Sequence, residues 1–186
     1  NFLTETYLSL RRLENKVLRV LYGEGQGVLG VAASDIIKVS IQQFYGIEIN
    51  DFAVTVAKTA LWIAESQMLD ETKNIIYGLD GDFLPLKTYV NITEGNALRI
   101  DWNDVISADE LNYIMGNPPF VGNSRLGDSQ RAERSKLFDD RSGELDYVCC
   151  WYKLASEYIT NTDIRCAFVS TNSICQGQQV TPLWKP

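Results

Sequence analysis

Segments with the pattern of strands alternate with segments that have helical periodicity, and this alternation restricts the fold of the chain more than any other feature. Near the start, apolar residues recur at helical spacing, as in Leu3, Tyr7 and Leu10. Runs rich in β-branched and aromatic residues predict strands at 36–41, 44–49, 89–93, 112–115 and 165–170, and helical patterns cover 50–67 and 145–158. Such alternation favours an α/β fold with a mostly parallel sheet.

Composition narrows the class of protein further. The 186 residues suit one domain or part of one, and a hydrophobic share of 45% is enough for a sizeable core. The net charge of -7 disfavours a phosphate backbone as partner unless basic residues cluster locally. No apolar run approaches the length of a membrane-spanning helix, and no export signal is evident, so we expect a cytoplasmic protein with no membrane partner.

Two residue types limit the chemistry. The chain contains no histidine, which excludes Ser-His and Cys-His catalysis and the usual zinc hydrolases. The four cysteines, Cys149, Cys150, Cys166 and Cys175, lack the paired spacings of metal ligands. We therefore expect no metal site.

A glycine-rich stretch, Gly25–Gly30, has the form G-x-G-x-x-G, and Glu48 follows its last glycine by eighteen positions. A dinucleotide-binding loop of this form needs a strand before it and a helix after it. Here a predicted helix precedes the glycines and a β-branched run follows them. The pattern thus favours a helix-to-strand loop, and a non-catalytic nucleotide-binding α/β module remains an alternative.

The tetrapeptide Asn117-Pro118-Pro119-Phe120 directly follows the strand predicted at 112–115. Two prolines fix φ and supply no N–H, so the backbone carbonyls are left as free acceptors. The Asn117 amide oxygen and the Pro118 carbonyl can then accept hydrogen bonds from an NH2 group while the Phe120 ring stacks on a heterocycle. A rigid turn with an aromatic cover is the structural alternative.

This tetrapeptide, with its flanks Tyr113–Gly116 and Val121-Gly122, resembles the catalytic motif of S-adenosylmethionine-dependent N6-adenine DNA methyltransferases. The flanks are most similar to bacterial type IIG enzymes, which combine cleavage, methylation and specificity in one polypeptide. The resemblance implies methyl transfer from S-adenosylmethionine to a flipped adenine in double-stranded DNA. It also implies that Asn117, Pro118, Pro119 and Phe120 are the catalytic residues.

The same resemblance implies a cofactor site. Phe2 would pack on the cofactor, Glu48 would accept hydrogen bonds from both ribose hydroxyls, and Ile49 would flank the adenine ring. Asn96, with Ala97 beside it, occupies the place where this family usually has an Asp that binds the adenine amino group. An Asn oxygen can still accept that bond.

The fold implied by the resemblance is a truncated Rossmann-like class I methyltransferase sheet in the gamma order. Residues 1–111 would form the cofactor-binding part and 112–186 the catalytic part. The first strand and glycine loop would lie upstream, and the last strands and the target-recognition domain downstream. We expect such a chain alone to have little or no activity. The strand edges that it exposes would be covered by rearrangement, by strand exchange in a homodimer, or by the rest of a larger protein.

The sequence also offers weaker candidate sites and alternative acceptors of the methyl group. The stretch 123–142 is a candidate mobile loop for DNA phosphates or a solvated loop of mixed charge, and Ser170–Ser173 and Gly177–Val180 are candidates near the target base. The basic residues of that stretch are Arg125, Arg131, Arg134, Lys136 and Arg141. Cytosine N4, an RNA base or a glutamine side chain are alternative acceptors. Cytosine C5 is disfavoured, since no cysteine has a proline neighbour.

Overall fold

The computed structural model describes residues 2–23, 33–78 and 90–184. The chain divides into two compact units, residues 1–97 and 98–186, and each is described by itself. Each unit combines helices with a two-stranded parallel sheet. The expected α/β class with parallel strands is confirmed.

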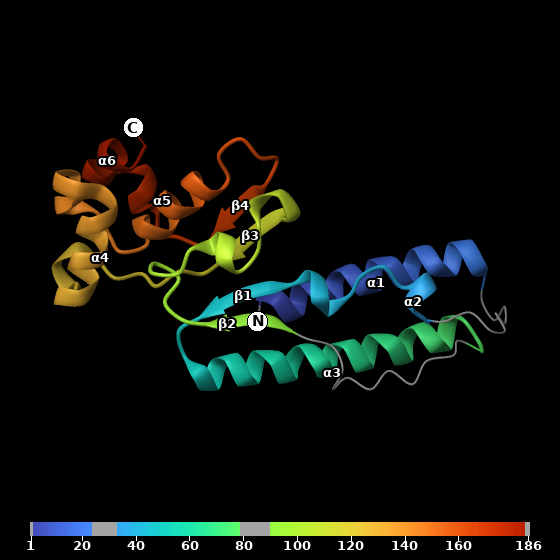
Figure 1. Ribbon diagram of the computed structural model, residues 1–186. Coiled ribbons are helices and arrows are strands. Elements are labelled where there is room, and N and C mark those ends of the chain that lie inside the picture. The colour runs from blue at the N-terminus through green and yellow to red at the C-terminus, as the bar shows by residue number, and fades with distance from the viewer. Residues whose placement is uncertain (1, 24–32, 79–89, 185–186) are drawn as a thin grey trace. The chain divides into compact units, whose positions relative to one another are not determined.

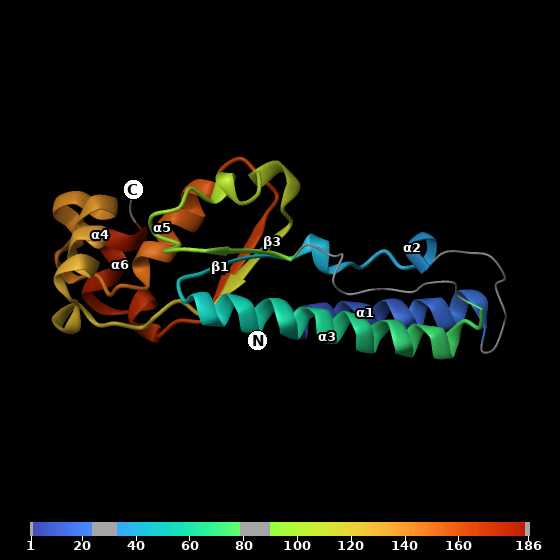
Figure 2. The ribbon, with the colours of Figure 1, turned by 60° about the horizontal axis from the view of Figure 1, so that its bottom comes forward.

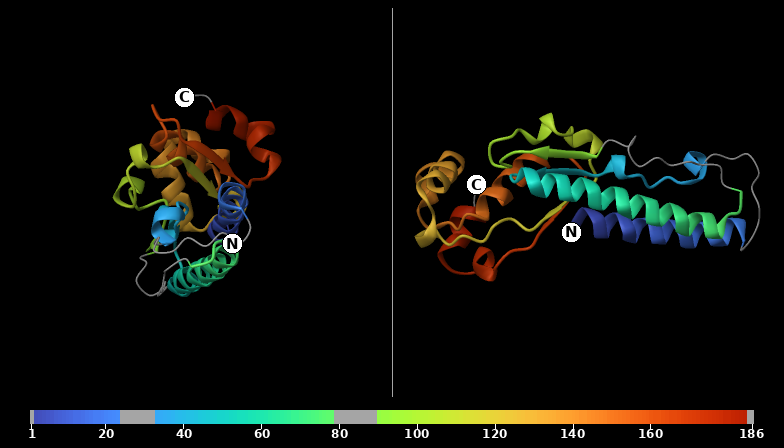
Figure 3. Two further views of the ribbon diagram at one scale, coloured as in Figure 1. Left: turned by 90° about the vertical axis from the view of Figure 1, so that its right-hand side faces the viewer. Right: turned by 90° about the horizontal axis from the view of Figure 1, so that it is seen from below.

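The first unit packs two long helices beside a small sheet. Its elements are α1 (Phe2–Tyr22), α2 (Ala33–Ile36), a 3-10 turn (Ile41–Gln43), β1 (Tyr45–Glu48), α3 (Asp51–Ile75) and β2 (Asn91–Glu94). Helices α1 and α3 lie side by side in every view (Figures 1 and 2), and the right-hand view of Figure 3 shows them again in blue and green. β1 and β2 are parallel, with Tyr45 opposite Asn91 and Glu48 opposite Glu94.

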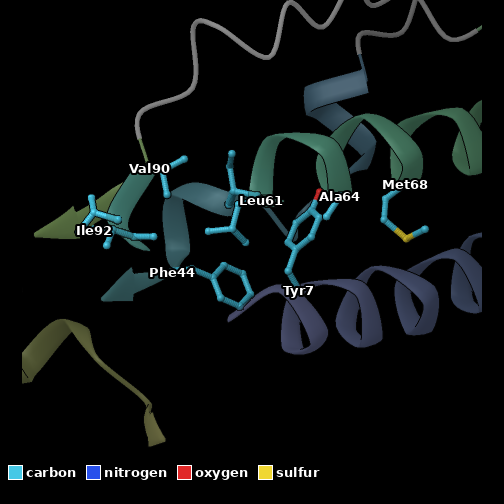
Figure 4. Close-up of a cluster of buried hydrophobic side chains, with 9 residues drawn as sticks. Tyr7, Phe44, Leu61, Ala64, Met68, Val90 and Ile92 are labelled. Carbon is cyan, nitrogen blue, oxygen red and sulfur yellow. The ribbon is translucent and has the colours of Figure 1, made fainter. Parts of the chain in front are cut away.

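The core of this unit lies between the helices and the sheet (Figure 4). Tyr7 of α1 meets Phe44 edge to face, with ring centroids 5.7 Å apart. The buried cluster comprises Tyr7, Ile41, Phe44, Val54, Leu61, Ala64, Met68, Val90 and Ile92. Asn50 starts α3 as its N-cap, because its side-chain oxygen accepts the backbone N–H of Ala53 at 2.9 Å.

A glycine in β1 allows the first turn of α1 to approach the sheet closely. A Cβ atom on Gly46 would lie 3.2 Å from Leu3 Cδ1, tighter than ordinary van der Waals contact. The same atom would also touch the side chain of Ile92 on β2. Gly46 therefore sets the spacing between helix and sheet near Phe2.

A buried polar cluster joins α1 to α3. Thr72 Oγ1 accepts a hydrogen bond from Arg11 Nη2 at 2.7 Å and lies 2.8 Å from Asn15 Oδ1. Arg11 also forms an ion pair with Glu14 one turn along α1. Because Arg11 and Thr72 are almost fully buried, their polar groups depend on these partners.

The second unit is built around β3 (Tyr113–Gly116) and β4 (Arg165–Phe168), which pair in parallel with Gly116 opposite Phe168. Its helices are α4 (Asp128–Phe138), α5 (Cys149–Tyr158) and α6 (Val180–Trp184). Short 3-10 turns occupy Trp102–Asp104, Ala108–Glu110, Asn123–Arg125, Asp139–Glu144, Asn172–Cys175 and Gly177–Gln179.

The core of the second unit joins α4, α5 and the segment after β4. Its buried cluster comprises Leu126, Phe138, Leu145, Tyr147, Val148, Cys149, Cys150 and Ile174. Tyr152 of α5 meets Phe168 at the end of β4 edge to face, with ring centroids 5.4 Å apart. This contact fixes α5 against the carboxyl end of β4.

Two predicted elements differ from the structure of the first unit. The strand expected at 36–41 is wrong: helix α2 ends at Ile36 and no strand follows before β1 among the described residues. The reason is that the Glu14 carboxylate accepts the backbone N–H groups of Lys38 and Val39, which a neighbouring strand would otherwise bind. Helix α3 continues past Gln67 to Ile75, because its buried face continues as well.

None of the helices within 2–23, 33–78 and 90–184 is long and apolar enough to span a membrane.

We expect Thr72→Val to lower the free energy of unfolding by about 1–3 kcal/mol, since it leaves buried donors and acceptors on Arg11 and Asn15 without a partner. Urea titration of the full-length protein would measure this change. Thr59→Val is the matched control, because Thr59 is exposed on the same helix. Equal effects of the two substitutions would contradict the role given to the polar cluster.

Candidate active site

The corner Asn117–Phe120 begins where β3 ends. The last ladder bond of the sheet runs from the Val169 N–H to the Gly116 carbonyl at 2.9 Å. Pro118 and Pro119 have no N–H with which to continue the ladder, so the strand stops at this point. The corner therefore lies at the carboxyl end of a parallel pair, where ligands of α/β sheets bind.

The corner exposes the side chains of Asn117 and Phe120 to solvent and buries Pro118. Asn117 is exposed, and its side chain has no hydrogen-bond partner within the described residues. Pro118 is buried, but no donor in the described part of the chain reaches its carbonyl oxygen. Phe120 is 45% exposed. The corner thus combines two oxygen acceptors that have no partner in the described residues with a partly exposed aromatic ring.

In the first unit, Glu48 closes β1 and is half-buried. Its Oε1 atom accepts the Asn50 N–H at 3.1 Å, and no partner among the described residues reaches Oε2. The Gly95 N–H donates to the Glu48 carbonyl at 2.8 Å, which holds the turn after β2 at the same sheet edge. Glu48 and the turn that contains Asn96 and Ala97 therefore share one end of the sheet.

The other predicted cofactor residues are also in the first unit. Phe2 opens α1 and is 43% exposed, and Ile49 directly follows β1 and is 68% exposed. Asn96 and Ala97 are half-buried. Their assigned roles remain predictions. The glycine-rich stretch 25–30 lies outside the described residues.

Residues 123–142 were predicted to be a loop, either mobile or solvated, and this is wrong, because the stretch contains two 3-10 turns and α4, with Leu126 and Phe138 in the core. Arg134 is buried: its Nη1 atom donates to Asn123 Oδ1 at 2.7 Å and to the Leu145 carbonyl at 2.6 Å. Its guanidinium therefore stabilises the protein itself and cannot reach a DNA phosphate. Of the other candidates, Arg125, Arg131 and Lys136 are exposed, and the Arg141 side chain lies outside the described residues.

Sequence reasoning missed Asp146, which connects the candidate segment after β4 to the residues that follow the corner. Its Oδ2 atom accepts hydrogen bonds from Ser173 Oγ at 3.1 Å and from Gln179 Nε2 at 2.7 Å, and its Oδ1 atom accepts the Asn123 N–H at 3.0 Å. The sequence signal that could have marked it is a carboxylate between the apolar residues Leu145 and Tyr147.

A second set of hydrogen-bonded side chains connects α4 to the residues just before α5. The Tyr147 hydroxyl donates to Glu133, whose other oxygen accepts Arg99 Nε at 2.6 Å. Burial, followed by the hydrogen bond to Glu133, raises the pKa of the Tyr147 phenol. Tyr147 is therefore a neutral donor at physiological pH and has no basic role.

The buried Cys149 and Cys150 offer no nucleophile at this site. Burial raises the pKa of the Cys149 and Cys150 thiols to about 12, so neither is a thiolate at neutral pH. No group of three or more potential metal-ligating side chains occurs in the described ranges. The chemistry that these residues support is therefore positioning by hydrogen bonds and stacking.

Comparisons with known proteins identify relatives over nearly the whole chain. Residues 1–186 match the family model described as MmeI, DNA-methyltransferase domain. DNA methyltransferase A of Bacillus subtilis (strain 168) is 40% identical over 188 residues, which cover 99% of this chain and 21% of that protein. A solved structure of the type IIL restriction-modification enzyme MmeI in complex with DNA is 45% identical, with a TM-score of 0.89, and the match covers 99% of this chain and 25% of that one. The chain thus spans about a fifth to a quarter of these relatives.

We expect iodoacetamide to label the exposed Cys175 of the folded protein and to leave Cys149 and Cys150 unlabelled until it unfolds. Their raised pKa keeps both thiols protonated, so protection should persist even at a pH of about 9. Peptide mapping by mass spectrometry after a timed pulse would measure each site. Labelling of Cys149 as fast as that of Cys175 would contradict this expectation.

Proposed function

The chain belongs to the family of MmeI DNA-methyltransferase domains, and we propose from this premise that it transfers a methyl group from S-adenosylmethionine to the N6 atom of adenine in DNA. The relatives support DNA as the substrate, because one is named as a DNA methyltransferase and the other was solved in complex with DNA. The observation that carries the proposal for an exocyclic amine is the corner after β3, where Asn117 is exposed and two oxygen acceptors have no partner in the described residues.

The corner can activate an exocyclic amine by hydrogen bonding. The lone pair of the adenine amine is delocalised into the ring, which makes the nitrogen a poor nucleophile. Asn117 Oδ1 and the Pro118 carbonyl would each accept one amine hydrogen and hold the nitrogen in a more tetrahedral geometry. This pre-ordered geometry lowers the barrier to methyl transfer without a charged base. The proton lost from the amine can pass to solvent, so no histidine is needed.

The cofactor side of the proposal depends on Glu48. S-adenosylmethionine, when bound, supplies an electrophilic methyl group. Glu48 suits the two ribose hydroxyls, since a carboxylate accepts several hydrogen bonds and its Oε2 atom has no partner within the described part of the chain. The exposed Ile49 and Phe2 side chains offer apolar contacts, and Asn96 offers an amide at the same sheet edge as Glu48.

A target amine inside a duplex must be rotated out before it can reach the corner. Flipping costs a few kcal/mol of unstacking and unpairing, and stacking on the exposed Phe120 ring would offset part of it.

We also propose, from the DNA substrate, that the protein acts in the bacterial cytoplasm.

The two small sheets suit the Rossmann-like fold expected from the resemblance. Within the described residues, β1 pairs with β2 alone and β3 with β4 alone, so β1 and β3 each keep one edge without a strand partner. We propose that in a longer protein further parallel strands pair with these edges. In an isolated chain, strand exchange between two copies could cover the same edges.

The direct test is transfer of an isotope-labelled methyl group from S-adenosylmethionine to DNA by the full-length protein, followed by nucleoside mass spectrometry. We expect labelled N6-methyladenine and, because Asn117→Ala removes an acceptor at the reacting amine, a rate lower by a factor on the order of a hundred or more in that variant.

Asn112→Ala is the matched control for Asn117→Ala, because Asn112 is an exposed asparagine at the other end of β3. It should leave the rate unchanged. Label in N4-methylcytosine, in RNA or in protein would overturn the adenine assignment, and an active Asn117→Ala variant would overturn the role of the corner.

We expect Glu48→Gln to weaken S-adenosylmethionine binding roughly tenfold or more, since a neutral amide replaces charge-assisted acceptors. Titration calorimetry on the full-length protein would measure the change. Glu94→Gln is the control, because Glu94 lies opposite Glu48 in the register and is exposed. The assignment of Glu48 fails if both variants bind as tightly as the parent.

A further inference from the structure

The carboxylate of Asp146 receives hydrogen bonds from two segments that are far apart in the sequence. Its Oδ1 atom accepts the backbone N–H of Asn123, which lies shortly after the corner. Its Oδ2 atom accepts Ser173 Oγ and Gln179 Nε2 from the segment after β4. Both oxygens are therefore used, one for each segment.

Backbone hydrogen bonds beside Asp146 strengthen the same connection. The Asp146 N–H donates to Gln179 Oε1 at 3.1 Å, so the Gln179 amide contacts both the backbone and the side chain of Asp146. The next residue, Tyr147, donates its N–H to the Val121 carbonyl at 2.9 Å. Residues 146–147, just before α5, thus hold the downstream end of the corner and the turns after β4 together.

The corner is fixed at its other end by the sheet. β3 and β4 are adjacent and parallel (Figure 1), and the Val169 N–H donates to the Gly116 carbonyl where they end. The chain leaves the sheet at Asn117 and meets Asp146 at Asn123. Asp146 therefore closes a ring of contacts that contains the corner and the start of the post-β4 segment.

We propose that Asp146 is a positioning residue, which holds the acceptors of Asn117 and Pro118 in a set orientation toward residues 170–173. This inference depends on the proposed function. Both carboxylate oxygens of Asp146 already accept hydrogen bonds from the protein itself, so the role proposed here is an indirect one. Its carboxylate acts through Asn123 and Ser173 to keep the amine's acceptors in place.

Loss of the carboxylate should loosen both segments without unfolding the protein. We expect amide hydrogen exchange to accelerate in Asp146→Ala at 117–127 and 169–180, and to stay unchanged in α1 and α3 of the full-length protein. Glu144→Ala is the matched control, since Glu144 is an exposed carboxylate two positions away with no partner in the described ranges. Unchanged exchange in Asp146→Ala would overturn the proposal.

The kinetic readout separates positioning from general destabilisation. We expect Asp146→Ala to lower kcat roughly 10- to 100-fold while the KM for S-adenosylmethionine stays within about twofold, because only the geometry at the reacting amine changes. Asp146→Asn keeps one acceptor oxygen and should recover part of kcat. When DNA with 2-aminopurine at the target position binds, the fluorescence change should be weaker with Asp146→Ala than with the parent protein.

The two proposals fail in different ways. If the parent protein methylates no DNA, the proposed function fails, and the exchange experiment alone decides whether Asp146 holds the two segments. If the parent is active and Asp146→Ala has the kcat of Glu144→Ala, the positioning role is wrong. Should Asp146→Ala not fold, Ser173→Ala removes a single donor from the same carboxylate and must lower kcat relative to the parent; a kcat equal to that of the parent would show that the positioning role is wrong.

Discussion

Two consecutive prolines at the end of a parallel strand are the constraint on which the proposed chemistry depends. They end the ladder of β3 because neither has an N–H, and they restrict φ on both sides of the Pro118 carbonyl. The Asn117 side chain is left exposed beside that carbonyl. Because the corner is rigid, two acceptors can be ready for one amine without the cost of ordering a flexible loop.

The same geometric rule operates in both units. In each, the predicted function lies where a parallel pair of strands ends: Glu48 is the last residue of β1, and Asn117 directly follows β3. Each hydrogen bond to a ligand replaces one to water and contributes only about 1 kcal/mol, so the arrangement of acceptors matters more than their number. Contacts with the surrounding segments, including those fixed by Asp146, would then determine which amine is accepted.

Local patterns in the sequence predicted much of the fold and the family, and missed what depends on distant contacts. Helix α1, strand β1 and the corner follow from residues adjacent in the sequence, and the resemblance to restriction-modification methyltransferases is confirmed. Helix α4 was missed because its sequence is polar and its buried contacts, through Arg134 and Phe138, come from elsewhere in the chain. The residues before β1 read as a strand because their binding to Glu14 is invisible in a local window.

The glycine in β1 also limits how this protein could change over evolution. A methyl group at position 46 would press on Leu3 at 3.2 Å, directly beside Phe2. A larger residue at 46 requires the Leu3 side chain to shift by a few tenths of an ångström or to be replaced by a smaller one, so the two sites are expected to covary among relatives. Where the Leu3 side chain does not give way, a larger residue at 46 would move the start of α1, and with it the aromatic ring assigned to the cofactor.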